Sequence, residues 1–159
     1  MKFIVSKKLS DTPVMRIILI WMFTVLEGVL VLNLVAKSID YGTSLGEWKS
    51  VIMGNEAEFI DPLPLSDLVL QVHTDLFALI MIFVMIASVL GRSPLPRQLK
   101  VFVLGSALAS LLLYPLGWLS VTWFGSASVA AGAFAFILFH LVMLIAGMVL
   151  IVGLIRKRI

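Results

Sequence analysis

Four long apolar stretches alternate with short polar connections along the chain. They cover about residues 14–36, 64–90, 95–123 and 127–155, and each reaches the roughly 20 residues that a helix needs to cross a bilayer. Pro13, Pro62 and Pro94 stand where helices begin, and Gly91 is a stop signal after the second stretch. The pattern predicts an all-α fold: an integral membrane four-helix bundle that forms a single transmembrane domain over residues 1–159.

The longest polar connection, residues 38–65, contains one local helix signal. Ser44 and Glu47 have the spacing of a capping box, and Trp48 follows them. This spacing predicts a short helix lying at the membrane interface. An irregular loop anchored by Trp48 is an equally weighted alternative.

Composition supports the membrane assignment. Of the 159 residues, 61% are hydrophobic and only 13% are charged, whereas about 25% are charged in soluble domains. The chain has no cysteine, which excludes thiolate metal sites, iron–sulfur clusters and covalently attached haem within it. The N-terminal lysines are not followed by a cleavable signal pattern, so the first stretch is interpreted as a retained helix. No basic-aromatic patch suggests binding to nucleic acid.

The basic residues predict the orientation of the bundle. Ten of the twelve Lys and Arg residues lie in three segments that an even number of crossings places on one side: the N-terminal tail with Arg16, the connection at 92–100, and residues 156–158. The positive-inside rule makes that side cytoplasmic, with both termini there. We therefore expect a multi-pass protein of the bacterial inner (cytoplasmic) membrane.

Two histidines, the only two in the chain, lie inside apolar stretches that run in the same direction. Helix rise places His73 roughly 25 Å and His140 roughly 21 Å from the cytoplasmic ends of their helices, so their depths are compatible. Two imidazoles from different helices suit the axial ligation of one non-covalent haem b. The predicted ligands of the haem iron are His73 and His140. Expected wall residues, which are apolar, aromatic or small, are Phe77, Ala133, Phe136, Met143 and Gly147.

Ionisable groups form a second candidate site. Glu27, Asp75 and Tyr114 fall at similar heights on three helices, and they form either one polar cluster or two. Asp75 points about 200° away from His73 on the same helix, so it cannot readily ligate the same iron. A proton path or a quinone-binding end is one interpretation. Protonated carboxyls that bond to neighbouring helices are the other, and for Glu27 the adjacent Gly28 favours such a close helix contact.

With its histidines on the second and fourth helices, the chain resembles the four-helix membrane subunits of b-type cytochromes. The His73-Thr74-Asp75-Leu76-Phe77 segment also resembles a group of uncharacterised bacterial four-helix membrane proteins that carry His-x-His-Leu-Phe at this point. Asp75 replaces the second histidine of that pattern. The first resemblance implies electron transfer between quinone and a peripheral partner.

Three functions follow from these patterns. The first is an electron-transfer protein with one b-type haem between the second and fourth helices, acting as a subunit of a larger redox complex linked to the quinone pool, or as a homo-oligomer. The second is a non-catalytic membrane subunit in which the polar residues serve as interhelical contacts. The third is a metal or proton transporter that uses Glu27, His73, Asp75 and His140.

Overall fold

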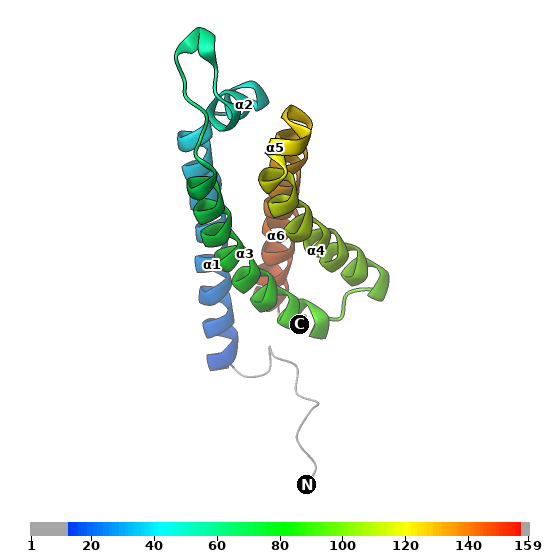
Figure 1. Cartoon of the computed structure of the whole chain (residues 1–159). Coiled ribbons are helices and arrows are strands. Elements are labelled where there is room, and N and C mark those ends of the chain that lie inside the picture. Colours follow the sequence, from blue (N-terminus) through cyan, green and yellow to red (C-terminus); the bar gives the residue numbers. More distant parts are fainter. Residues whose placement is uncertain (1–12, 157–159) are drawn as a thin grey trace.

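A computed structural model describes residues 13–156 of the chain, and it is built from helices (Figure 1). Four of these helices are long: α1 (Pro13–Tyr41), α3 (Leu65–Arg92), α4 (Arg97–Leu119) and α6 (Ser126–Ile155). Each is long and apolar enough to cross a membrane. The prediction of an all-α, four-helix integral membrane protein is confirmed, and the lipid bilayer is its environment.

Helix α6 lies at the centre of the bundle. It packs most extensively against α4, then against α1, and also against α3 and the short helix α2 (Leu45–Met53). Close approach between α4 and α6 depends on Gly132, because a Cβ atom there would overlap the indole of Trp118. Small residues allow helix backbones to approach closely inside membranes.

The capping box at Ser44 is formed, so α2 is a helix rather than an irregular loop. The Glu47 N–H donates to Ser44 Oγ at 3.2 Å, and the Ser44 N–H donates to Glu47 Oε2 at 2.8 Å. Trp48 is buried and donates from Nε1 to the Gly42 carbonyl at 2.8 Å. Its indole lies 5.7 Å from that of Trp118, so Trp48 attaches α2 to the ends of the spanning helices.

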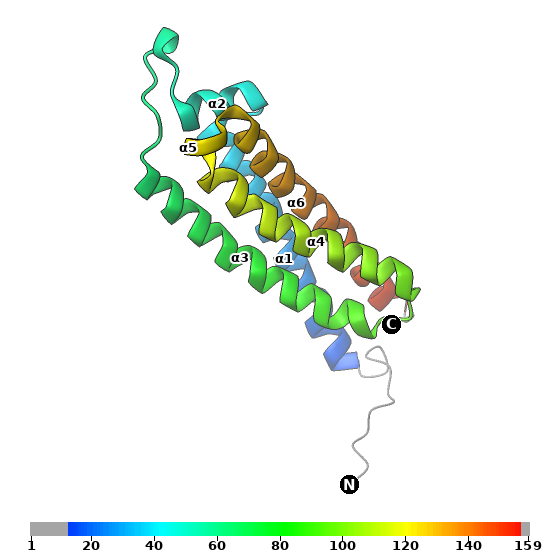
Figure 2. The ribbon, with the colours of Figure 1, turned by 45° about the vertical axis from the view of Figure 1, so that its right-hand side comes forward.

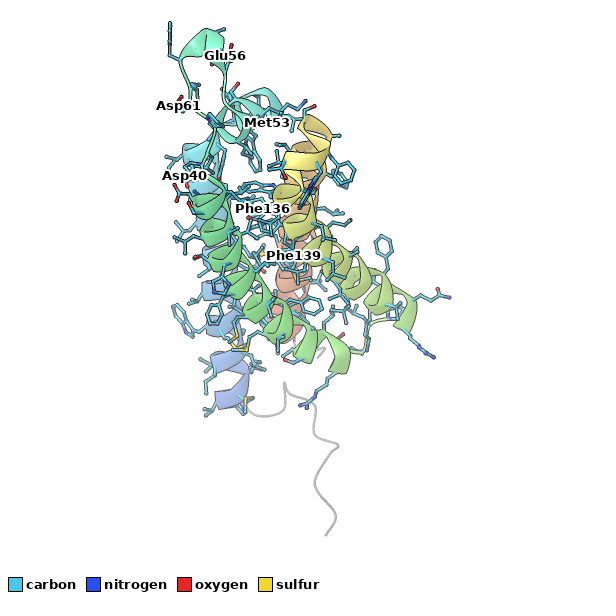
Figure 3. All side chains as sticks on the ribbon, viewed as in Figure 1. Asp40, Met53, Glu56, Asp61, Phe136 and Phe139 are labelled. Carbon is cyan, nitrogen blue, oxygen red and sulfur yellow. The ribbon has the colours of Figure 1, made fainter. Side chains whose placement is uncertain are left out.

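Beyond α2, the chain forms a loop that projects past the helices and contains the short helix η2 (Glu56–Glu58). Glu56 and Asp61 lie on this projecting loop, whereas Phe136 and Phe139 lie among the helices (Figure 3). The end of the bundle that carries α2 and this loop is called the α2 end below.

The start of α1, the α3–α4 connection and the end of α6 lie together at the opposite end (Figure 2). Lys100 closes the α3–α4 connection by donating from Nζ to the carbonyls of Gly91, at 3.0 Å, and Ser93, at 2.6 Å. This shared end agrees with the even-crossing topology. The basic tail residues before Pro13 and after Arg156 lie outside the described residues, and the cytoplasmic assignment of this end stays a prediction.

The third apolar stretch forms two helices rather than one. Helix α4 continues through Pro115 and ends at Leu119 instead of near Trp123, and the short helix α5 (Val121–Phe124) follows Ser120. Proline removes an N–H from the helical hydrogen-bond ladder. At Pro115 the missing bond is the one to the Leu111 carbonyl, one turn before the end of α4.

Candidate functional site: a polar cluster shared by four helices

Five polar side chains meet inside the bundle, and each spanning helix contributes at least one. We call this set the polar cluster: Asn33 and Lys37 from α1, Asp75 from α3, Tyr114 from α4 and His140 from α6. Lys37, Asp75, Tyr114 and His140 are 5%, 6%, 1% and 0% exposed. Ionisable groups at membrane depth are costly unless they are paired, and they mark functional sites more often than other residues do.

Asp75 is the hub of the polar cluster. Its Oδ2 atom lies 2.7 Å from Lys37 Nζ and accepts a hydrogen bond from the Tyr114 hydroxyl. Its Oδ1 atom accepts from Asn33 Nδ2 at 3.3 Å. The carboxylate is therefore compensated by one cation and two neutral donors, and it ties α3 to both α1 and α4.

Lys37, which directly follows the first apolar stretch, is buried in the bundle and does not extend to the lipid interface. Its ammonium pairs with Asp75 and lies 5.1 Å from the ring centroid of Tyr41 and 5.2 Å from that of Trp118. Contacts between a cation and aromatic faces stabilise a desolvated ammonium. Nearby, the Tyr41 hydroxyl donates to the Gln71 side chain, which gives α1 and α3 a second polar contact.

His140 contacts oxygen atoms with both ring nitrogens. Nδ1 lies 2.8 Å from the Phe136 carbonyl oxygen, and Nε2 lies 3.0 Å from Asn33 Oδ1. Asn33 thereby connects His140 to Asp75, since its amide contacts both. The phenyl ring of Phe136 covers the imidazole at a centroid distance of 4.1 Å.

The structure does not bring the two histidines together. His73 is exposed on α3, one residue away from buried Val72, whereas His140 is fully buried with both nitrogens engaged. Rotating α3 by about 100° would be needed to turn His73 inward, and that rotation would take Asp75 off its partners. In this arrangement the predicted axial pair does not face a common space, because position along a helix does not fix the direction around it. Axial ligation by His73 and His140 stays a prediction.

The residues expected to line the haem site also do not face one common space. Ala133, Phe136, Met143 and Gly147 are buried along one face of α6, but Phe77 is 69% exposed on α3. On this α6 face Gly147 packs against Glu27 of α1, whereas Ala133 and Phe136 line a cavity between α1, α2 and α6. Within residues 13–156, no three His, Asp or Glu side chains gather as a metal-binding group. Haem binding stays a prediction from sequence, which a reduced-minus-oxidised visible spectrum of the purified protein tests.

The three candidate proton-handling residues form two sites rather than one. Asp75 and Tyr114 meet in the polar cluster. The carboxyl of Glu27 is buried elsewhere in the α1–α6 interface, without a hydrogen-bond partner among the described residues. It lies against Gly147, where a Cβ atom would clash with it, whereas Gly28 has open space around it. The close helix contact expected at Gly28 is therefore made at Gly147.

The sequence analysis did not identify Asn33 and Lys37 as members of a polar site. Their spacing of four residues places them near one another on a helix surface. Leu30, Lys37 and Tyr41 continue the buried stripe of α1. That stripe was the available signal, because a lysine in register with buried apolar residues points into a bundle.

A family model for a transmembrane helical domain matches residues 44–159, which include every helix from α2 to α6. Asn33 and Lys37 of the polar cluster lie on α1, before the matched segment. Comparison with curated proteins and with solved structures gave no match. Because the matched segment covers more than half of the chain, the protein belongs to the Aq_1264_TM family of transmembrane helical domains.

Proposed function

We propose that this membrane protein transfers protons through the polar cluster. The observation that carries the proposal is the position of His140. Both of its ring nitrogens face oxygen atoms, and its Nε2 atom is linked to the Asp75 carboxylate through the amide of Asn33, by two hydrogen bonds. Proton relays in membrane proteins are commonly built from chains of buried Asp, Glu and His residues.

Hydrogen-bond chemistry gives the polar cluster a place for one additional proton. A neutral imidazole has a single N–H, so one of its nitrogens would direct a lone pair at an oxygen acceptor. A protonated imidazole donates to both oxygens. With Lys37 and Asp75 paired as ions, the neutral form of His140 therefore leaves one contact unsatisfied, and a proton from outside the cluster satisfies it.

Asn33 offers this proton a second location. Its amide nitrogen now donates to Asp75, and its amide oxygen faces His140. If the amide turns by about 180°, a change that exchanges its donor and acceptor, its nitrogen donates to a neutral His140. Its oxygen then requires a protonated Asp75. The proton can thus reside on His140 or on Asp75, and the orientation of the Asn33 amide follows its location.

Proton flux into liposomes tests the proposal. Purified protein is reconstituted in vesicles that contain a pH-sensitive dye, and a potassium diffusion potential drives protons inward. We expect flux above that of protein-free vesicles, and Asp75→Asn should lower it by about 100-fold, as the loss of a positioned proton-transfer group does. Wild-type flux equal to that of empty vesicles would overturn the proposal.

Gln71→Leu is the matched control for this experiment. It removes the hydrogen bond between Tyr41 and Gln71, which joins the same two helices as Asp75 does, but it removes no ionisable group. Its flux should remain close to that of the wild type. Equal losses in Gln71→Leu and Asp75→Asn would show that helix attachment, not proton transfer, limits the flux.

A second function is favoured by the distribution of the polar cluster over all four spanning helices. In this alternative the protein is a non-catalytic membrane subunit, and the polar cluster fixes helix packing for a partner. Asp75→Asn would then lower stability while the wild type itself carries no protons. Flux and stability, measured on the same variants, separate the two functions.

A further inference from the structure

A cavity of about 410 Å³ lies at the α2 end, between α1, the start of α2 and α6. Its wall includes Lys37 from the polar cluster, the aromatic residues Trp48 and Phe136, and the small residues Ala130 and Ala133. Sites for small molecules are typically concave and mostly apolar, with a few polar groups that orient the ligand. The cavity has this composition, with Lys37 as its charged group.

The ammonium of Lys37 has hydrogen-bonding capacity to spare. It carries three N–H donors, and Asp75 is the one acceptor bonded to it within residues 13–156. The side chain is 6% exposed, so bulk water does not readily satisfy the other donors. A buried donor without an acceptor is unfavourable, and an oxygen atom of a ligand would remove this cost.

Charge balance favours a neutral ligand. In the state without the additional proton, Asp75 already compensates Lys37, so an anionic headgroup would add an uncompensated negative charge next to an apolar wall. A carbonyl oxygen accepts a hydrogen bond from an ammonium without adding charge. The ligand chemistry that fits is therefore a neutral carbonyl group rather than a carboxylate or a phosphate.

The walls of the cavity favour a flat ring with an apolar tail. Trp48 and Phe136 provide aromatic surfaces, and Ala130 and Ala133 leave room beside them. Phe134, which is 65% exposed, also lines the cavity and places its opening on the lipid-facing surface of α6. We propose that this cavity binds a neutral, membrane-soluble amphiphile of the quinone class, with one ring carbonyl accepting a hydrogen bond from Lys37.

This inference deepens the proposed function, because the ligand would contact the polar cluster through Lys37, but its test measures binding instead of proton flux. Decylubiquinone is titrated into the purified full chain in detergent, and quenching of tryptophan fluorescence is recorded. We expect saturable quenching that is largely lost in Trp48→Phe. Sodium oleate and hexadecane, tested as competitors, should displace the quinone weakly.

Three variants locate the ligand. Ala130→Leu fills the cavity without touching the polar cluster and should weaken binding about tenfold or more, since it removes space that the ring needs. Ala131→Leu makes the same change one residue along, on the exposed side of α6, and should bind like the wild type. Lys37→Met should also weaken binding about tenfold, the expected effect of losing a charged hydrogen bond.

The proposal is overturned if decylubiquinone does not quench saturably, or if Ala130→Leu and Ala131→Leu bind it equally. Stronger competition by oleate would assign the cavity to an anionic lipid, and stronger competition by hexadecane would assign it to an acyl chain. A protein that binds decylubiquinone but carries no protons would support this site and refute the proton relay. The two proposals can therefore fail separately.

Discussion

Gly132 and Gly105 are glycines of spanning helices with different surroundings. A Cβ atom at Gly132 would overlap the indole of Trp118, whereas none of the atoms around Gly105 lies within 4 Å of such a Cβ. We expect Gly132→Ala to lower the free energy of unfolding by about 1–3 kcal/mol, because extra atoms in a tight interface force neighbours apart. Gly105→Ala should have no such cost. Thermal unfolding in detergent, followed by circular dichroism, measures both variants. Equal midpoint temperatures of unfolding for Gly132→Ala and Gly105→Ala would contradict the α4–α6 contact.

Asn33 permits a test of the proton locations by spectroscopy. Its amide oxygen is one of the two acceptors that face His140, so Asn33→Leu removes one reason for the ring to hold a second proton. Nitrogen-15 NMR of labelled histidine should show a smaller share of doubly protonated His140 in Asn33→Leu than in the wild type. His73 serves as the internal reference, because it is exposed on α3, unlike buried His140. An unchanged His140 signal would contradict the role given to Asn33.

At the scale of the helix, the sequence located the four spans but not all of their ends, and it did not determine which face of each helix points into the bundle. Apolar runs and start signals located the four spans, and the spacing of Ser44 and Glu47 located α2, because these features depend on neighbours in the chain. Depth along each helix is also local, which is why Asp75, Tyr114 and His140 could be identified. The direction of His73 depends on how α3 rotates against the bundle, and this rotation follows from contacts with distant residues such as Lys37.

The capping box of α2 predicts a local response to acid. Hydrogen bonds from the backbone and side chain of Ser44, and from the Thr43 backbone, hold the pKa of Glu47 below its usual value. A lowered pKa means that the ionised carboxylate stabilises α2 above the unfolded-state pKa, and that this contribution is lost as pH falls through the lower folded-state value. Amide hydrogen exchange in α2, corrected for the intrinsic pH dependence, should therefore increase on acidification below about pH 4, near the ordinary range of glutamate.

Glu47→Gln is the control for this response, because its side chain does not ionise. Exchange in α2 of this variant should be faster than in the wild type at neutral pH and should change little on acidification. Amides of α6, far from the capping box along the chain, should show no acid response that depends on residue 47. Identical pH profiles for wild type and Glu47→Gln would contradict the assigned cause.

At the scale of the whole molecule, polar contacts hold together helices that apolar packing joins only in part. Helix α6 packs on α1, α3 and α4, but α1 and α3 have no comparable direct packing. Three side-chain contacts connect them: Lys37 with Asp75, Asn33 with Asp75, and Tyr41 with Gln71. The α1–α3 side of the bundle is thus the place where loss of a polar group should have the largest effect on assembly.

A double-mutant cycle on Lys37 and Asp75 tests this arrangement. Lys37→Met and Asp75→Leu should each lower the free energy of unfolding by about 3–5 kcal/mol, because each leaves an uncompensated buried charge. The double variant should lose much less unfolding free energy than the sum of the two single variants, since it leaves neither ion.

Tyr41→Phe and Gln71→Leu form the matched cycle for a neutral pair on the same two helices, with a coupling of about 0.6 kcal/mol. Reversible unfolding in mixed micelles measures all six variants. A coupling no larger for the ion pair than for the neutral pair would mean that Lys37 and Asp75 do not interact as ions. The proton site on His140, which is argued from that ion pair, would then lose its basis.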